Sequence, residues 1–152
     1  MNKYIQKMKY FTIKELCYSD TAKAHKIDNT PNEEIIENLT EFTNEVLDKL
    51  RDALCSHIKV SSGFRCEKLN KKIGGSKTSS HLNGYAADLV PVNGDIDGLV
   101  ECAIELSKTF NFDQIIDEHS KGAHWVHIGY KNLKGQQRKQ IKVFKNGKYE
   151  KI

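Results

Sequence analysis

Three short segments in the middle of the chain are rich in side chains that bind metals or move protons. They are Ser61-Ser62-Gly63-Phe64-Arg65, Ser80-His81-Leu82-Asn83-Gly84-Tyr85-Ala86-Ala87-Asp88 and His124-Trp125-Val126-His127. A catalytic zinc site needs about three protein ligands of the histidine or carboxylate type and one open position for water. His81, Asp88 and His127 supply two imidazoles and one carboxylate, so they are the candidate ligands for one zinc ion.

Two of these candidate ligands lie in apolar surroundings. Alanine, leucine and valine flank Asp88, and valine and isoleucine flank His127. A carboxylate in such a strand is costly unless it is paired or bound to a cation, and a shared metal accounts for both groups. The residues alone leave two other interpretations open. His127 can be a hydrogen-bonded core histidine, and Asp88 can simply pair with Arg65.

A long amphipathic helix is predicted before these segments. Thr30-Pro31-Asn32-Glu33 is typical of a helix start in which Thr30 is the cap and proline takes the first helical position. Apolar residues then recur at three- and four-residue steps as far as Leu54. This pattern predicts one helix of about 24 residues that buries a single stripe.

Shorter elements complete the predicted fold. Thr12 and Asp95 are predicted to cap two further helices, and Gly74 is predicted to end a short helix over 67–73. Strands are predicted over 58–61, 85–90, 114–117 and 125–129. Helices and strands are segregated, which predicts an α+β fold with a small, mostly antiparallel sheet and helices packed on one side.

No repeat or linker divides the chain, so we expect a single domain over residues 1–152. Its helical part is predicted at about residues 10–55 and its catalytic core at about 56–130. A C-terminal hairpin is predicted at about 138–152, because Asn146-Gly147 is a strong signal for a two-residue turn.

Composition limits the classes of function. The chain has 152 residues, is 38% hydrophobic and carries a net charge of +4. No apolar run approaches the ~20 residues of a membrane span, and Met1–Tyr10 does not resemble a secretory signal. We therefore expect synthesis in the cytoplasm, no membrane insertion and a monomer. The C-terminal lysines suggest nucleic-acid binding only weakly, since no recognised motif accompanies them. The four cysteines form no Cys-x-x-Cys pair and are expected to be reduced.

The ordered segments resemble the zinc D-alanyl-D-alanine carboxypeptidase family, which includes D-alanyl-D-alanine dipeptidases and phage L-alanyl-D-glutamate endolysins. The pieces that carry the resemblance are Ser62-Gly63-Phe64-Arg65, Asn70, Gly74-Gly75-Ser76, the segment from Ser79 to Asp88, and Trp125-Val126-His127. The resemblance covers roughly residues 58–130. It implies a hedgehog-like peptidase fold, one Zn²⁺ ion, and hydrolysis of a peptide bond in peptidoglycan stem peptides.

The resemblance also implies roles for individual residues. His81, Asp88 and His127 are expected to bind zinc, and Arg65 to bind the substrate and stabilise negative charge on the carbonyl oxygen. The family places its general base three residues before the last ligand, which is His124 in this chain. Histidine suits that role because its ordinary pKa of ~6.5 lies near working pH. Ser80 and Trp125 are expected beside the ligands or the substrate.

The assignment of His124 depends on a geometric condition. Residues three apart in a regular strand point to opposite faces, so His124 and His127 share a site only if the chain near Gly122 is irregular. If the strand is regular, Glu118, Asp117 or His119 becomes the candidate base.

A second question is whether the domain is catalytic at all. A zinc-binding recognition module of the same fold would keep the three ligands and lack a usable base. Within the enzyme hypothesis, the sequence leaves open whether a carboxypeptidase or an endopeptidase bond is cut. The expected cytoplasmic location suits an endolysin that reaches the wall after release through a holin.

Overall fold

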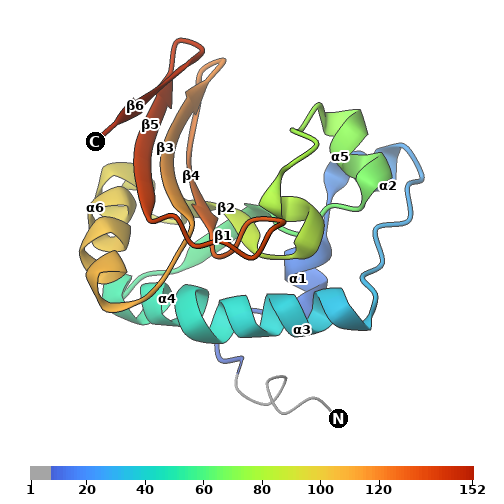
Figure 1. Ribbon diagram of the computed structural model, residues 1–152, viewed down its shortest axis with the longest axis horizontal. Coiled ribbons are helices and arrows are strands. Elements are labelled where there is room, and N and C mark those ends of the chain that lie inside the picture. Colours follow the sequence, from blue (N-terminus) through green and yellow to red (C-terminus); the bar gives the residue numbers. More distant parts are fainter. Residues whose placement is uncertain (1–7) are drawn as a thin grey trace.

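The apolar stripe predicted near the N-terminus forms a long helix that runs beneath the sheet (Figure 1). A computed structural model describes residues 8–152 of the chain. The helix consists of α3 (Glu33–Phe42), a π-helical turn (Thr43–Leu47) and α4 (Asp48–Leu54), which follow one another without a break. Its stripe is fully buried at the positions that face the core, namely Leu39, Phe42, Val46, Leu47 and Leu50.

The start of this helix differs from the prediction. Asn32, not Thr30, is the N-cap, and its side chain accepts a hydrogen bond from the Ile35 amide at 2.9 Å. The Thr30 hydroxyl instead donates to the Asp28 carboxylate at 2.6 Å. Asparagine is as good a cap as threonine or better, and the neighbouring carboxylate engages the threonine hydroxyl.

The other helices are short. Thr12 caps α1 and Asp95 caps α6 through their side chains, as predicted, and Gly74 ends α5. The helix α2 was not predicted. The bounds are α1 Ile13–Cys17, α2 Asp20–Ala24, α5 Glu67–Ile73, η3 Ser80–Asn83 (a 3₁₀ turn), α6 Ile96–Leu106 and η4 Ser107–Thr109 (a second 3₁₀ turn).

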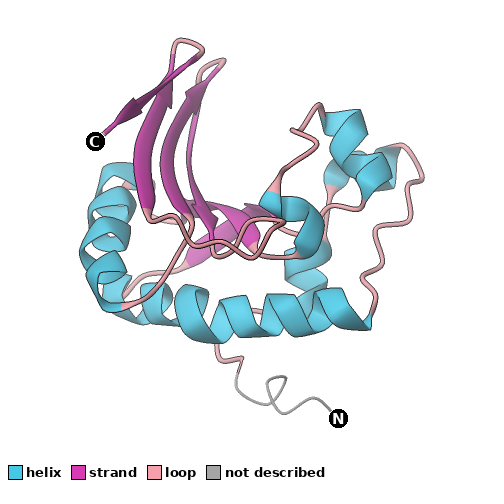
Figure 2. Ribbon diagram, in the orientation of Figure 1, coloured by secondary structure: helices cyan, strands magenta, loops and turns pink. Residues whose placement is uncertain are grey.

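Within residues 8–152, six strands form one sheet in the order β1-β2-β4-β3-β5-β6 (Figure 2). The strands are β1 Ile58–Ser62, β2 Ala86–Pro91, β3 Gln114–Ser120, β4 Ala123–Gly129, β5 Gln140–Lys145 and β6 Lys148–Lys151. Neighbouring strands are antiparallel except for the parallel pair β3–β5. The predicted C-terminal hairpin is β5–β6, and it extends the sheet through this parallel pair.

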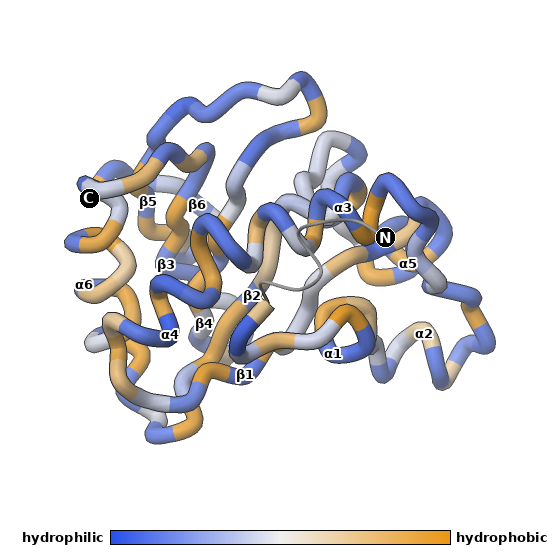
Figure 3. The backbone as a smooth tube through the Cα atoms, turned by 90° about the horizontal axis from the view of Figure 1, so that it is seen from below, coloured by the Kyte–Doolittle hydropathy of each residue, from blue (hydrophilic) through white to orange (hydrophobic). Residues whose placement is uncertain are grey.

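One face of the sheet is covered and the other carries the polar segments. Ile115, Val126 and Ile128 point from β3 and β4 into a core shared with the long helix and α6. Figure 3 shows hydrophobic and hydrophilic positions alternating along the helices, as expected for helices that bury one side. The predicted α+β class with a mostly antiparallel sheet is therefore confirmed.

The central hairpin β3–β4 is longer than predicted. Its strands are joined by the two-residue turn Lys121-Gly122, in which both residues have positive φ, at 50° and 80°. The strand pairing is regular from Gln114 opposite Gly129 up to Ser120 opposite Ala123. Turns of this kind match the twist of an antiparallel pair, so the alternation of faces continues to the tip.

None of the helices within residues 8–152 is long and apolar enough to cross a membrane. All four cysteines lie in this part of the chain and are free thiols. Most of the segment examined for a secretory signal, residues 1–7, lies outside the described residues.

Candidate functional site

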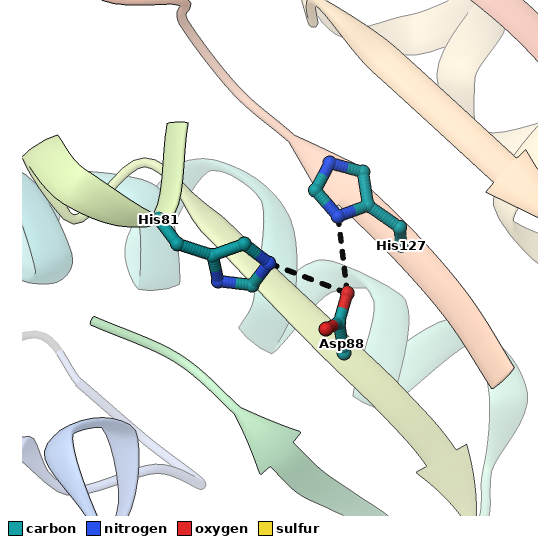
Figure 4. Close-up of side chains that lie close together, drawn as sticks. All are labelled: His81, Asp88 and His127. Atoms are coloured by element: carbon teal, nitrogen blue, oxygen red, sulfur yellow. Dashed lines mark hydrogen bonds and ion pairs between the residues drawn. The ribbon is translucent and has the colours of Figure 1, made fainter. Parts of the chain in front are cut away.

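Three side chains from three different elements converge on one point of the uncovered face. His81 comes from η3, Asp88 from β2 and His127 from β4, and both rings point at the same carboxylate (Figure 4). His81 Nε2 lies 3.4 Å and His127 Nδ1 lies 3.0 Å from Asp88 Oδ1. The candidate ligand atoms all lie within 4.8 Å of one another. Small side-chain adjustments would bring them to the ~2.0–2.2 Å at which these atoms bind zinc.

The hydrogen bonding of His81 fits a cation at this point. Its Nδ1 lies 2.7 Å from the Gly63 carbonyl oxygen, which can only accept, so Nδ1 carries the proton. Burial lowers the pKa of His81, although Asp88 opposes the shift, and this favours the neutral ring. Nε2 therefore carries no proton and faces a carboxylate oxygen. Both atoms are hydrogen-bond acceptors, so no hydrogen bond can form between them. A metal ion between them removes the conflict, and a backbone carbonyl that orients the ring is typical of metal-binding histidines.

Asp88 carries the charge that a metal requires. Burial alone would raise the pKa of Asp88, but the hydrogen bond from His127 acts in the opposite direction, and the pKa lies below its ordinary value of 3.8. Arg65 adds an ion pair, with Nη2 at 3.4 Å from Asp88 Oδ2. The carboxylate is therefore ionised, which is the form that binds cations.

Strand register places two of the candidate ligands side by side. Asp88 lies directly opposite His127 in the β2–β4 pair and opposite Ser62 in the β1–β2 pair. Pairing in β1 is interrupted between Val60 and Ser62, where an irregularity adds one residue. Such bulges redirect a strand, and here the redirected chain leads into the Gly63–Arg65 loop.

Gly63 has a steric reason to be glycine. A Cβ at this position would lie 2.0 Å from the Leu16 carbonyl oxygen, the same oxygen that accepts the Phe64 amide at 2.8 Å. The close approach ties the loop to α1. The loop in turn holds His81, since the Arg65 amide donates to the His81 carbonyl at 3.0 Å.

Arg65 is fixed in place by three hydrogen bonds from different guanidinium nitrogens. Nε donates to Ser62 Oγ at 3.0 Å, Nη1 to Asn70 Oδ1 at 3.2 Å and Nη2 to Asp88 Oδ2 at 3.4 Å. Each terminal nitrogen keeps a second N–H beyond these bonds. Gly75 leaves room for the arrangement, because a Cβ there would lie 2.1 Å from Asn70 Oδ1. Three residues of the motif, Ser62, Asn70 and Gly75, thus serve to orient one guanidinium.

The convergence point lies in a pocket of about 620 Å³. Its lining includes Arg65, His81, Asp88, Glu118, Trp125, His127, Arg138, Lys142, Phe144 and Tyr149. Glu118 faces this pocket because it is paired with Trp125, on the same side of β3–β4 as His127. Burial raises the pKa of Glu118 above its ordinary value of 4.5, Asp88 acts in the same direction, and His127 and Arg65 oppose.

The structure does not bring His124 to this pocket. The hairpin is regular, so His124 points to the opposite face, where its Nε2 lies 2.5 Å from Asp117 Oδ1 and its ring stacks on His119 at 3.9 Å. The geometric condition attached to His124 as the base is therefore not met. Of the alternatives named from the sequence, Glu118 alone lines the pocket, while Asp117 and His119 share the far face.

Ser80 and Trp125, expected near the ligands or substrate, both line the pocket. Ser79, rather than Ser80, caps the η3 turn by accepting from the His81 amide. The Trp125 indole N–H is buried and has no hydrogen-bond partner among residues 8–152. A buried donor of this kind beside a pocket is available for a hydrogen bond to a ligand.

Comparison with models of known protein families gives a match that covers the site residues. A model of the family described as Peptidase M15 matches residues 9–129, from before α1 to the end of β4. The match therefore includes the three candidate ligands, Arg65 and Glu118. No curated protein matches the chain. Because the match spans most of the chain, the protein belongs to the Peptidase M15 family of zinc metallopeptidases.

Proposed function

We propose that the protein hydrolyses a peptide bond in the stem peptides of bacterial peptidoglycan, with zinc held by His81, Asp88 and His127. The observation that carries the proposal is the convergence of these side chains in a pocket that also holds a half-buried carboxylate, Glu118, and a fixed guanidinium, Arg65. Two imidazoles and one carboxylate form the ligand set of many catalytic zinc sites. A zinc ion bound there would polarise the scissile carbonyl and lower the pKa of water.

We assign Glu118 as the general base. It accepts the proton of the attacking water, and it returns that proton to the leaving nitrogen as the carbon–nitrogen bond breaks. Its raised pKa suits both steps, because a base that must later act as an acid works best with a pKa near the operating pH. Glu118 takes the place that the sequence suggested for His124.

Arg65 stabilises the negative charge that develops on the carbonyl oxygen. Its side chain is only 11% exposed, and the guanidinium is already oriented by Ser62 and Asn70. A donor fixed before the reaction needs no reorganisation as charge develops, which makes it effective in a site that excludes water.

The charge of the pocket supports an anionic peptide as substrate. Arg138 and Lys142 line the side formed by the chain after β4 and by β5. Arg138 is anchored by two bonds to the buried Asp113, at 2.7 and 2.8 Å, and its side chain is still 42% exposed. Stem peptides carry several carboxylates, so a cationic wall beside the metal suits them better than neutral peptides.

Zinc measurement and product analysis together test the proposal. Purified protein is incubated with peptidoglycan and with a stem pentapeptide, the products are identified by mass spectrometry, and zinc is measured by emission spectroscopy. We expect a defined peptide product, and we expect His81→Ala to hold one zinc equivalent fewer and to lose turnover. Which product forms distinguishes a carboxypeptidase from an endopeptidase.

Two results would contradict the proposal. Unchanged zinc content in His81→Ala would exclude the ligand set. Zinc bound at this site with no hydrolysis of any peptidoglycan fragment would favour the alternative, a zinc-binding recognition module without catalysis.

A further inference from the structure

A second cluster of metal-binding side chains lies at the far end of the β3–β4 hairpin. It consists of Asp117, His119 and His124, and we call it the tip cluster. Its candidate ligand atoms also lie within 4.8 Å of one another. Asp117 Oδ1 is 2.5 Å from His124 Nε2 and 3.2 Å from His119 Nε2. Like the pocket site, it brings two imidazoles to a single carboxylate oxygen.

Regular strand pairing creates the tip cluster. His119 lies directly opposite His124 in the β3–β4 pair, and Asp117 is two residues before His119 on the same strand face. Directly opposed residues have Cβ atoms about 4.5–5.5 Å apart, within reach of a shared ion. The rings stack with centroids 3.9 Å apart and planes 22° from parallel, and both Nε2 atoms lie beside Asp117 Oδ1.

The tip cluster is separate from the peptidase pocket. Glu118 and Trp125 face the pocket, whereas the residues on either side of them in the two strands face the other way. None of the three side chains has a part in the hydrolysis described above. The sheet itself therefore lies between the two groups of ligands.

The surroundings leave the tip cluster open to solvent. The side chains of His119, His124 and Asp117 are 30%, 26% and 16% exposed. The two histidines line a surface pocket of about 470 Å³ between the β3–β4 and β5–β6 hairpin tips, which lie close together in Figure 1. Lys145 also lines this pocket, but it is exposed and its long side chain can turn away. Water can therefore complete the coordination shell of an ion.

We propose that Asp117, His119 and His124 form a second metal site, which takes a divalent transition-metal cation of the zinc type. Imidazole nitrogen and carboxylate oxygen in this ratio suit zinc and its neighbours, not calcium or magnesium, which prefer oxygen ligands. The ion clamps β3 to β4 at their free end. Because it binds only the folded hairpin, it also raises the stability of the chain.

Zinc titration of the full chain tests the second site, with free zinc buffered by a competing chelator and bound metal measured by emission spectroscopy. We expect two zinc equivalents for the wild type, with the second bound at a dissociation constant below about 10 µM. Asp117→Asn, which keeps the side-chain shape, and His124→Ala are each expected to bind one. His25→Ala, at an exposed histidine elsewhere, is the matched control and is expected to bind two.

The double variant Asp88→Asn, Asp117→Asn separates the two sites. Its expected zinc content is zero, while Asp88→Asn alone keeps one equivalent and its thermal midpoint rises with added zinc. A single equivalent in the wild type that survives in Asp117→Asn and is lost in Asp88→Asn would overturn the second site and leave the peptidase site intact. A single equivalent that survives in Asp88→Asn and is lost in Asp117→Asn would overturn the peptidase ligand set instead.

Discussion

Glu118 and His124 point to opposite faces of the same hairpin, and this relationship decides which of them can serve the peptidase pocket. Glu118 is paired with Trp125 and shares its face with His127, whereas His124 is paired with His119 and bonds to Asp117 behind the sheet. A proton acceptor must lie within hydrogen-bond reach of the attacking water. Only the face with His127 meets that requirement.

The first prediction concerns Glu118. Glu118→Gln keeps the size of the side chain but cannot accept the proton, so kcat is expected to fall by about 10²–10⁴. Zinc content should not change, because Glu118 is not among the candidate ligands. Steady-state kinetics on a stem peptide and zinc analysis of the same preparation measure both quantities.

The control for this variant is Glu101→Gln, an exposed glutamate on α6 away from the pocket, which is expected to keep full turnover. If Glu118→Gln retained wild-type kcat while His124→Ala lost it, the base would have to be reassigned to the far face of the hairpin.

The second prediction concerns the shape of Arg65, not its charge. Arg65→Lys keeps a cation but cannot bond to Ser62, Asn70 and Asp88 in the fork geometry that the guanidinium uses. We expect kcat to fall by about 10²–10³, the usual cost of losing a fixed oxyanion donor. The control is Lys49→Arg, at a lysine in an exposed ion pair with Glu45. Full activity in Arg65→Lys would show that a point charge suffices.

The third prediction concerns the contact between Gly63 and Leu16. Gly63→Ala places a Cβ 2.0 Å from the Leu16 carbonyl oxygen, and both groups are backbone, so the loop has to shift. The expected loss in the free energy of unfolding is about 3 kcal/mol, measured by urea denaturation. Gly135→Ala meets nothing within 4 Å but has a φ of +76°, so it should lose only about 1 kcal/mol. A loss at Gly63 no larger than the loss at Gly135 would mean that the loop accommodates the added Cβ and that the Leu16 contact does not require glycine.

The sequence predicted most elements of this fold but not the details that select the base. Motif spacing pointed to His81, Asp88 and His127, and the structure brings them together. The strands of the β3–β4 hairpin were predicted too short, because a lysine with positive φ in the Lys121-Gly122 turn gives no clear sequence signal for a turn. Had the strands been extended to that turn, their alternation would have placed Glu118, not His124, beside His127.

The sequence also did not predict which strands far apart in the chain pair with one another. The parallel pairing of β5 with β3 joins segments separated by β4 and a loop, and hydrophobic alternation does not reveal which strands are neighbours. This pairing is what brings Lys142 into the wall of the pocket. The same limit applies to the tip cluster, whose three members are visible in the sequence only once the register of β3 and β4 is known.

The last prediction concerns the reactivity of two free thiols. Burial raises the pKa of Cys17 to about 11, because the thiolate would lose its hydration among the apolar residues around α1. The thiolate is the reactive form, so at pH 8 only about one Cys17 in a thousand is reactive at any moment. Cys55 lies exposed to solvent at the end of α4. Iodoacetamide at pH 8 should therefore alkylate Cys55 first, as seen by peptide mass spectrometry. The rate of Cys17 alkylation should rise about tenfold for each unit of pH up to about 10. In denaturant the alkylation should be fast at every pH in this range. A Cys55→Ser variant tests this directly. If its Cys17 thiol reacted quickly at pH 8 without denaturant, α1 would have to open readily. The contact of Leu16 with the Gly63 loop would then be weaker than its geometry implies.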